Sequence, residues 1–148
     1  MLLYKIIPMS PRQVVEEIDS IVADTVDILD RIYRDKYETD KRYLKELTTK
    51  AMRLAHSDVA DVIAIRQLGE GWVAEETWAI ALYCAIRHID SVEDAIIASV
   101  NHDGDSDSTG SVCGNIIGAI YGYEHIKERN IFCPEGKQLE ETLELSEI

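Results

Sequence analysis

Basic residues are scarce in this chain of 148 residues. It carries 15 Lys and Arg against 28 Asp and Glu, which gives a formal net charge of −13 at pH 7. Nucleic acids and anionic membrane surfaces attract proteins through clustered basic residues, so the composition argues against both as partners. No apolar run approaches the roughly 20 residues that a membrane-spanning helix requires. The sequence therefore predicts neither a nucleic-acid-binding protein nor a membrane protein.

Cysteine is also rare, with three residues at positions 84, 113 and 133. The odd number and the lack of scaffold-like spacing favour reduced thiols over disulfides. Cys84 and Cys113 lie in apolar helical runs and are expected in the core. The first nine residues, MLLYKIIPM, have only Lys5 as a basic residue and no small-residue cleavage site, so they do not resemble a signal peptide. We expect this segment to lie against a hydrophobic surface and the protein to be cytoplasmic.

Repeats, low-complexity tracts, a Walker loop, a GxSxG elbow and strand-rich segments are all missing, and helical periodicity dominates. Helices are predicted at about 11–34, 40–55, 73–88 and 91–100, with a short one between Ser57 and Gly69 and a last one through Gly110–Gly122. Ser10 and Gln13 form a capping box for the first of these, and Ser57 and Asp61 suggest another. We expect one all-α domain over residues 1–130 and an acidic tail over 131–148. Residues expected on core faces include Ile28, Ile32, Tyr43, Leu47, Trp78, Leu82, Ile96 and Ile97.

The most polar loop of the chain, residues 101–109, runs directly into the last helix. At a turn that enters a helix, the carboxylates of Asp105 and Asp107 converge, and Ser108 adds a hydroxyl. Mg²⁺, Mn²⁺ and Ca²⁺ prefer such hard oxygen ligands. Asp and Ser are also preferred helix caps, so capping is an equal alternative. An EF-hand is excluded, because Gly114 or Ile116 stands where its loop needs a final Glu.

The last predicted helix carries a glycine stripe at positions 110, 114, 118 and 122. Each Gly inside a helix costs about 0.5–1 kcal/mol relative to Ala. We therefore expect a neighbouring backbone to come very close to this stripe. The other side of the helix is apolar as well, which is typical of a central, buried helix.

A second loop of interest has the sequence Gly69-Glu70-Gly71-Trp72. The glycines permit tight backbone geometry near a ligand, and Trp72 offers an aromatic face. The alternative is a plain turn between helices, with Trp72 filling the core. Glu75 and Glu76 fall in the first turn of the next helix, where its dipole favours carboxylates. His102, beside the acidic run, is expected to be a hydrogen-bonded neighbour.

Three segments together resemble a known family: DGDSDSTG at 103–110, LGEGWVAEE at 68–76 and AIALYC at 79–84. They are similar to the C-terminal part of the ADP-ribosylglycohydrolases, which include dinitrogen reductase-activating glycohydrolases and ADP-ribosyl-acceptor hydrolases, and the likeness is best over residues 50–126. The resemblance implies an all-α bundle like the C-terminal half of that fold, with a two-metal site for Mg²⁺ or Mn²⁺. Asp105, Asp107 and Ser108 match the family's C-terminal metal-ligand motif. The residues then expected near substrate are Gly71, Trp72, Glu75, Gly110 and Asn115.

The sequence also departs from that family, whose members are longer. Their N-terminal glycine-rich segment and Thr-Asp-Asp cluster, which supplies the other metal ligands, have no counterpart here. Two octahedral ions need on the order of twelve coordination positions, so three side chains cannot hold both. The expected function is metal-dependent hydrolysis of the glycosidic bond linking ADP-ribose to an acceptor, performed with a complementary N-terminal half or in a homo-oligomer. The alternatives are a truncated, inactive relative that binds metal, nucleotide or a partner, and a structural domain whose acidic loop only caps a helix.

Overall fold

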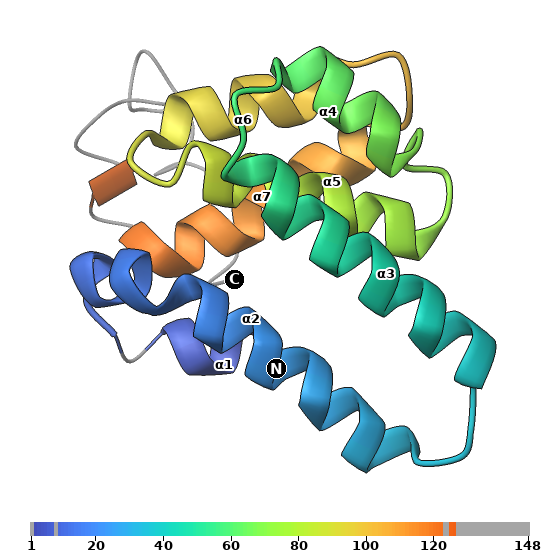
Figure 1. The fold of residues 1–148 in the computed structure, drawn as a ribbon. Coiled ribbons are helices and arrows are strands. Elements are labelled where there is room, and N and C mark those ends of the chain that lie inside the picture. Colours follow the sequence, from blue (N-terminus) through green and yellow to red (C-terminus); the bar gives the residue numbers. More distant parts are fainter. Residues whose placement is uncertain (1, 8, 123–124, 127–148) are drawn as a thin grey trace, which may run out of the picture.

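The computed structural model describes residues 2–7, 9–122 and 125–126. All of its regular structure is helical, as predicted (Figure 1). The expected acidic tail and Cys133 lie outside the described residues. None of the helices described is long and apolar enough to cross a membrane. The helices, in chain order, are α1 (Leu2–Ile6), α2 (Pro11–Tyr33), α3 (Glu38–Ala55), α4 (Asp61–Leu68), α5 (Ala74–Arg87), α6 (Val92–Val100) and α7 (Ser106–Tyr121).

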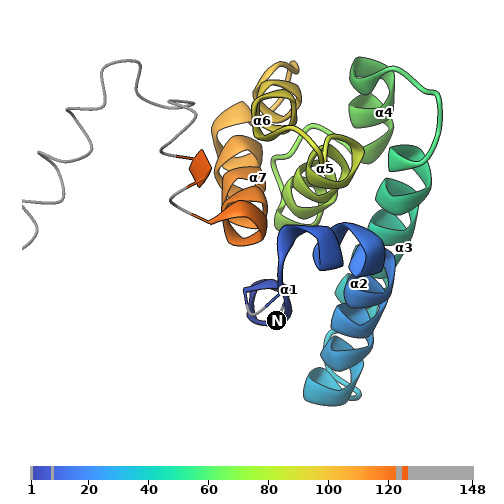
Figure 2. The same cartoon turned by 90° about the vertical axis from the view of Figure 1, so that its left-hand side faces the viewer.

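Helix α5 is the centre of the fold. Figure 2 shows it between α6 and α7 on one side and α3 and α4 on the other. All eight residues from 79 to 86 are buried. The prediction that α7 is the central helix is therefore wrong. Helix α7 buries only one face, because Ser111 and Asn115 on its other side are exposed.

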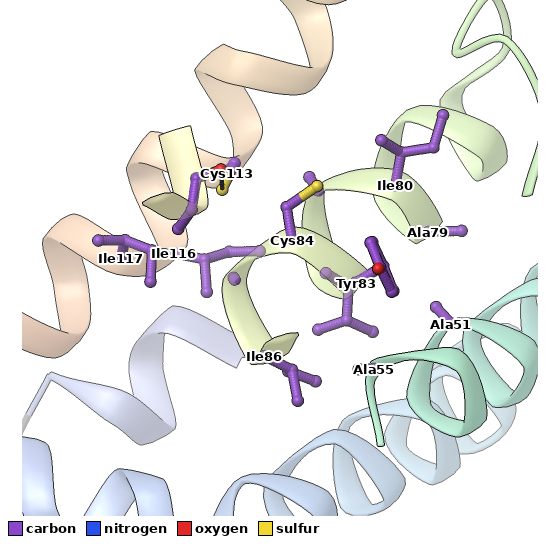
Figure 3. Close-up of a cluster of buried hydrophobic side chains, with 14 of the residues drawn as sticks. Ala51, Ala55, Ala79, Ile80, Tyr83, Cys84, Ile86, Cys113, Ile116 and Ile117 are labelled. Atoms are coloured by element: carbon purple, nitrogen blue, oxygen red, sulfur yellow. Dashed lines mark hydrogen bonds between the residues drawn. The ribbon is translucent and has the colours of Figure 1, made fainter. Parts of the chain in front are cut away.

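The core joins α5 to α7 and α3 (Figure 3). Cys113 and Ile116 of α7 pack on the side of α5 that carries Cys84, while Tyr83 lies toward Ala51 of α3. Both cysteines are free thiols in the core, as predicted. Burial raises the pKa of Cys113 to about 11 and also raises that of Cys84. Neither thiol is therefore ionised near neutral pH.

Helices α2 and α3 form a hairpin that runs past the core. Ser10 and Gln13 form the predicted capping box at the start of α2. The connected ends of the two helices project away from the other helices (Figures 1 and 2). The expectation that Ile32 and Tyr43 face the core is consequently wrong, since their exposed fractions are 57% and 41%. Apolar residues continue at helical spacing into these projecting ends, where α5 no longer covers them.

The N-terminal segment lies on the core, as expected. Leu2 and Ile6 of α1 are buried, and α1 packs against α2 and α7. Lys5 extends the contact through an ion pair with Asp24 of α2, 2.7 Å between nitrogen and oxygen. Asp24 has a lowered pKa because of its hydrogen bond and charge interaction with Lys5.

Two helix predictions differ from the structure in detail. Helix α4 starts at Asp61 without a side-chain cap, because its N-cap residue is Ala60, and the Ser57 hydroxyl donates to the Leu54 carbonyl at the end of α3. Helix α6 is capped by Ser91 as predicted, but Ile97 is 56% exposed rather than inward.

The glycine stripe of α7 does not meet a neighbouring backbone, contrary to expectation. A Cβ atom at Gly110 would lie 2.6 Å from a methyl group of Val100, so this glycine is required by close packing on α6. At Gly114 and Gly118 the nearest atoms are side-chain methyl groups at 3.7 and 3.9 Å, which is ordinary contact. Gly122 ends the helix with a φ of +78°.

Candidate functional site

The acidic loop enters α7 through Asp105, which is the N-cap residue. Its carboxylate accepts a hydrogen bond from the backbone N–H of Ser108 at 3.4 Å. Asp107 and Ser108 follow in the first turn of the helix. The capping alternative therefore describes what Asp105 does in the structure. Capping occupies only part of one carboxylate, which leaves further oxygen lone pairs on the loop.

The two loops that the sequence singles out touch each other. The backbone N–H of Asp105 donates to the carbonyl oxygen of Glu70 at 2.7 Å. Gly104 lies so close that a Cβ atom there would be 1.8 Å from the same oxygen. Gly71 packs on the other side of the contact, where its Cβ position would be 3.1 Å from a methyl carbon of Thr109. Loops more than 30 residues apart in sequence thus form one backbone-to-backbone junction.

The Gly69–Trp72 loop is fixed to the beginning of α5. The Glu76 carboxylate accepts hydrogen bonds from the backbone N–H groups of Glu70 and Gly71, both at 3.1 Å. The Thr77 hydroxyl donates to the carbonyl of Gly71 at 2.7 Å. From the sequence, Glu76 is expected to interact with the helix dipole or, alternatively, to reach a metal-bound water or a ribose hydroxyl, and its bonds to the loop backbone are not predicted. The glycines around Glu70 were the available signal that the backbone N–H groups of this loop are accessible.

Hydrogen bonds of His102 and Thr109 fix the acidic loop to the rest of the protein. The Gly104 N–H donates to His102 Nδ1 at 3.1 Å, so His102 Nε2 carries the hydrogen and donates to the Thr109 hydroxyl at 2.8 Å. Thr109 is completely buried and donates to the Ser99 carbonyl at 2.7 Å. His102, for which a metal ligand, a base and a partner of Asp103 are the alternatives from the sequence, is thus a hydrogen-bonded neighbour as expected, with Thr109 and Gly104 as its partners. Thr109 was missed, because nothing in the sequence marks one hydroxyl of this loop as buried.

A depression of about 630 Å³ lies beside the junction, between the first turns of α5 and α7. Of the predicted metal ligands, Asp107 and Ser108 line it directly. Its other lining residues mix hydroxyl groups with apolar and aromatic side chains: Ala74, Thr77, Trp78, Ser111 and Val112. The depression therefore combines a carboxylate with hydroxyl groups and an indole ring.

The predicted substrate-binding residues are only partly gathered here. Gly71 lies at the junction, whereas Gly110 packs against Val100 of α6. Trp72 is 68% exposed and donates from Nε1 to the Glu70 carboxylate, so it does not fill the core. Asn115 is exposed further along α7. Glu75 lines a different hollow, formed with the α2–α3 hairpin.

The acidic loop carries at least one ionised carboxylate. The pKa of Asp105 is lowered, chiefly by hydrogen bonds with Asp107 and Ser108. It is therefore ionised at neutral pH. Asp105, Asp107 and Ser108 offer three hard oxygen ligands, which fit part of the octahedral shell of Mg²⁺ or Mn²⁺. The described residues contain no group of three or more His, Cys, Asp or Glu side chains that could hold a metal ion.

The sequence of the chain is similar to those of known proteins. The chain matches the sequence profile of the ADP-ribosylglycohydrolases over residues 3–146. It belongs to the ADP-ribosylglycohydrolase family. It is 25% identical over 126 residues to ADP-ribosylhydrolase ARH3 of Bos taurus, covering 78% of this chain and 34% of the relative. It is 24% identical over 127 residues to ARH3 of Homo sapiens, covering 79% and 34%.

The match leaves most of each relative uncovered. ARH3 of Mus musculus gives 25% identity over 126 residues, again 34% of its length. The chain therefore spans about a third of these curated relatives. No solved structure matches it significantly. The all-helical architecture is consistent with the helical fold of the ADP-ribosylglycohydrolase family.

Proposed function

We propose that this chain carries the C-terminal metal loop and the adjoining substrate wall of an ADP-ribosylhydrolase. The reaction is hydrolysis of the glycosidic bond that links ADP-ribose to a protein or another acceptor. Family membership supports this reaction class. The single structural observation that carries the proposal is the junction of the acidic loop with the Gly69–Trp72 loop beside an open depression.

In this proposal, Asp105, Asp107 and Ser108 hold Mg²⁺ or Mn²⁺ at the edge of the depression. A bound ion would supply Lewis-acid polarisation of the substrate or of the attacking water. It would also offset the repulsion between a protein of net charge −13 and a pyrophosphate. A cation is needed at this position because the carboxylates of Asp105 and Asp107 would otherwise repel the pyrophosphate.

The remaining residues of the depression would orient the substrate. Ser111 presents a hydroxyl group that can donate to or accept from ribose hydroxyls, whereas the Thr77 hydroxyl, which donates to the Gly71 carbonyl, can accept from them. The Trp78 indole is partly buried and donates from Nε1 to Thr48, which fixes the ring as an apolar wall. Trp72 offers a second, exposed indole for stacking on a base. A role for Gly110 and Asn115 would be indirect, through the packing of α7.

A second candidate function is supported by the small number of ligands. Three side chains cannot complete two octahedral shells. A chain with this loop alone would bind one cation or a nucleotide without turnover. A complementary N-terminal half or a second copy of the chain would have to supply the missing ligands for the reaction.

Titration of the purified chain with Mn²⁺ and then with ADP-ribose tests the proposal. We expect heat of Mn²⁺ binding in the wild type and its loss in Asp107→Ala, because Asp107 lines the depression and does not cap the helix. Asp103→Ala is the matched control, since the Asp103 carboxylate is 84% exposed and pairs with Arg66 instead. Absence of Mn²⁺ heat in the wild type would refute the metal site.

Turnover separates the two candidates. Release of ADP-ribose from an ADP-ribosylated peptide in the presence of Mn²⁺, by wild type but not by Asp107→Ala, would identify a hydrolase. Binding of Mn²⁺ and ADP-ribose without release would favour the inactive relative. Repeating the assay over a range of protein concentrations tests whether a second copy completes the site.

A further inference from the structure

Glu76 makes an unusual contact for a residue in the first turn of a helix. One oxygen of its carboxylate, Oε2, accepts from two consecutive backbone N–H groups, those of Glu70 and Gly71. Consecutive N–H groups that converge in this way form a small concavity that binds anions. Here the concavity is occupied by a carboxylate from the chain itself. Hydrogen bonds to a charged acceptor are roughly twice as strong as neutral ones.

The loop that Glu76 holds has little stiffness of its own. Gly69 has a φ of +133° and Gly71 a φ of +83°, both in the region that side-chain-bearing residues avoid. Glycine enters such conformations freely and leaves them as freely. A Cβ atom at Gly69 would come within 2.4–2.6 Å of Cδ, Cγ and Oε2 of Glu76. The bend therefore closes directly around the Glu76 side chain.

The backbone carbonyl of Glu70 faces the acidic loop. The N–H of Glu70 points to Glu76, and its carbonyl accepts from the N–H of Asp105 at 2.7 Å. Gly104 lies against this carbonyl with no room for a side chain. A displacement of Glu70 toward Gly104 would push the acidic loop, and a displacement away from it would break the hydrogen bond from the Asp105 N–H, so either one affects the acidic loop.

We propose that Glu76 is a positioning residue for the acidic loop, acting through the Glu70 backbone on Asp105. This inference rests on the proposed function, in which Asp105 holds a divalent cation. Glu76 would set where the ligands lie without being a ligand itself. Mutation of a group that orients a metal ligand typically lowers metal affinity by about 10–100-fold. We expect about a 10-fold loss of Mn²⁺ affinity in Glu76→Ala, at the lower end of this range, because Glu76 contacts the Glu70 backbone and not Asp105 itself.

Amide hydrogen exchange in the metal-free chain tests the coupling without using activity. In Glu76→Ala, the amides of Glu70 and Gly71 lose their acceptor and should exchange faster. The coupling predicts that the Asp105 amide also loses protection, although its acceptor is untouched. Faster exchange confined to residues 70 and 71 would mean that Glu76 is only a local cap and would overturn the inference.

Two further variants make the result specific. Glu75→Ala removes the same charge from the same helical turn and keeps both loop bonds, so Asp105 exchange and Mn²⁺ affinity should match the wild type. Glu76→Gln keeps an acceptor oxygen and should restore most of the protection. Equal effects of Glu75→Ala and Glu76→Ala would overturn the inference in favour of a general charge effect.

Titration with Mn²⁺ separates this inference from the proposed function. An affinity lowered about 10-fold in Glu76→Ala supports the positioning role, and an unchanged affinity contradicts it. If the wild type binds no Mn²⁺, the proposed function fails, and the exchange of the Asp105 amide alone decides whether Glu76 positions the loop.

Discussion

Substitution of Gly104 by Ala would test the junction between the two loops most directly. Gly104 is not in the left-handed region, so an Ala there meets no conformational penalty. The added methyl group would instead lie 1.8 Å from the Glu70 carbonyl oxygen, whereas ordinary contact begins at 3.4 Å. One loop must therefore retreat by about 1.6 Å, because the atom that it meets belongs to the backbone and not to a flexible side chain.

The expected cost follows from what this retreat breaks. Overpacking of this kind costs about 1–3 kcal/mol, and the lost bond from Asp105 to Glu70 adds about 0.5–1.5 kcal/mol. Reduced entropy of the unfolded chain returns about 0.4–1 kcal/mol. We therefore expect Gly104→Ala to lower the free energy of unfolding by about 2–3 kcal/mol.

Urea denaturation at pH 7, followed by the helical circular dichroism signal, measures this difference. Gly114→Ala is the matched control, because its methyl group would meet Ile96 at an ordinary 3.7 Å. Replacing a glycine inside a helix should stabilise this control by about 0.5–1 kcal/mol. If Gly104→Ala were as stable as the wild type, the two loops would not be in backbone contact. The proposed function would then lose the structural observation on which it rests.

Two other predictions concern the scaffold. Tyr83→Phe should destabilise the chain by about 1.5–2 kcal/mol at pH 7, because the buried Tyr83 hydroxyl donates to Asp61 at 2.6 Å. Burial, and after it the hydrogen bond to Asp61, raises the pKa of Tyr83 above its usual 10. Above pH 10 only the unfolded wild-type chain loses this proton, so the difference in the free energy of unfolding between wild type and Tyr83→Phe should shrink there by about 1.4 kcal/mol per pH unit. A difference in urea midpoints that does not change between pH 7 and 11 would contradict this. Ser10→Ala removes the acceptor of the Gln13 N–H and should lower the free energy of unfolding by about 1 kcal/mol, measured by thermal or urea denaturation. Ser20→Ala is the control, because Ser20 is exposed, and it should cause no measurable loss. Equal effects of the two substitutions would argue against the capping box.

The long helices were predictable because their signals are local. The Ser10 capping box and the apolar spacing after it define α2 without reference to any other element. Ser91 does the same for α6. The choice of central helix is not local. The sequences of α5 and α7 are both largely apolar, and only the packing of α3 against α5 decides that α5 is enclosed.

The site was predictable in its parts and not in its assembly. The acidic loop and the Gly69–Trp72 loop stand out by composition, but the bond that joins them links two backbone groups, which leave no mark on residue type. The identity of Gly104 is demanded by the contact, because a Cβ atom there would overlap the Glu70 carbonyl oxygen. The roles of Glu76 and Thr109 depend on which donors and acceptors face them, and these come from other elements.

The enclosure of α5 also limits how this chain can vary. Three of its eight consecutive buried residues are alanines, at positions 79, 81 and 85, each at most 1% exposed. Any larger side chain there would push a neighbouring helix away, and the same helix begins at the loop that Glu76 holds. Substitutions should therefore accumulate on the projecting ends of α2 and α3, while the three alanine positions in the middle of α5 accept no larger side chain.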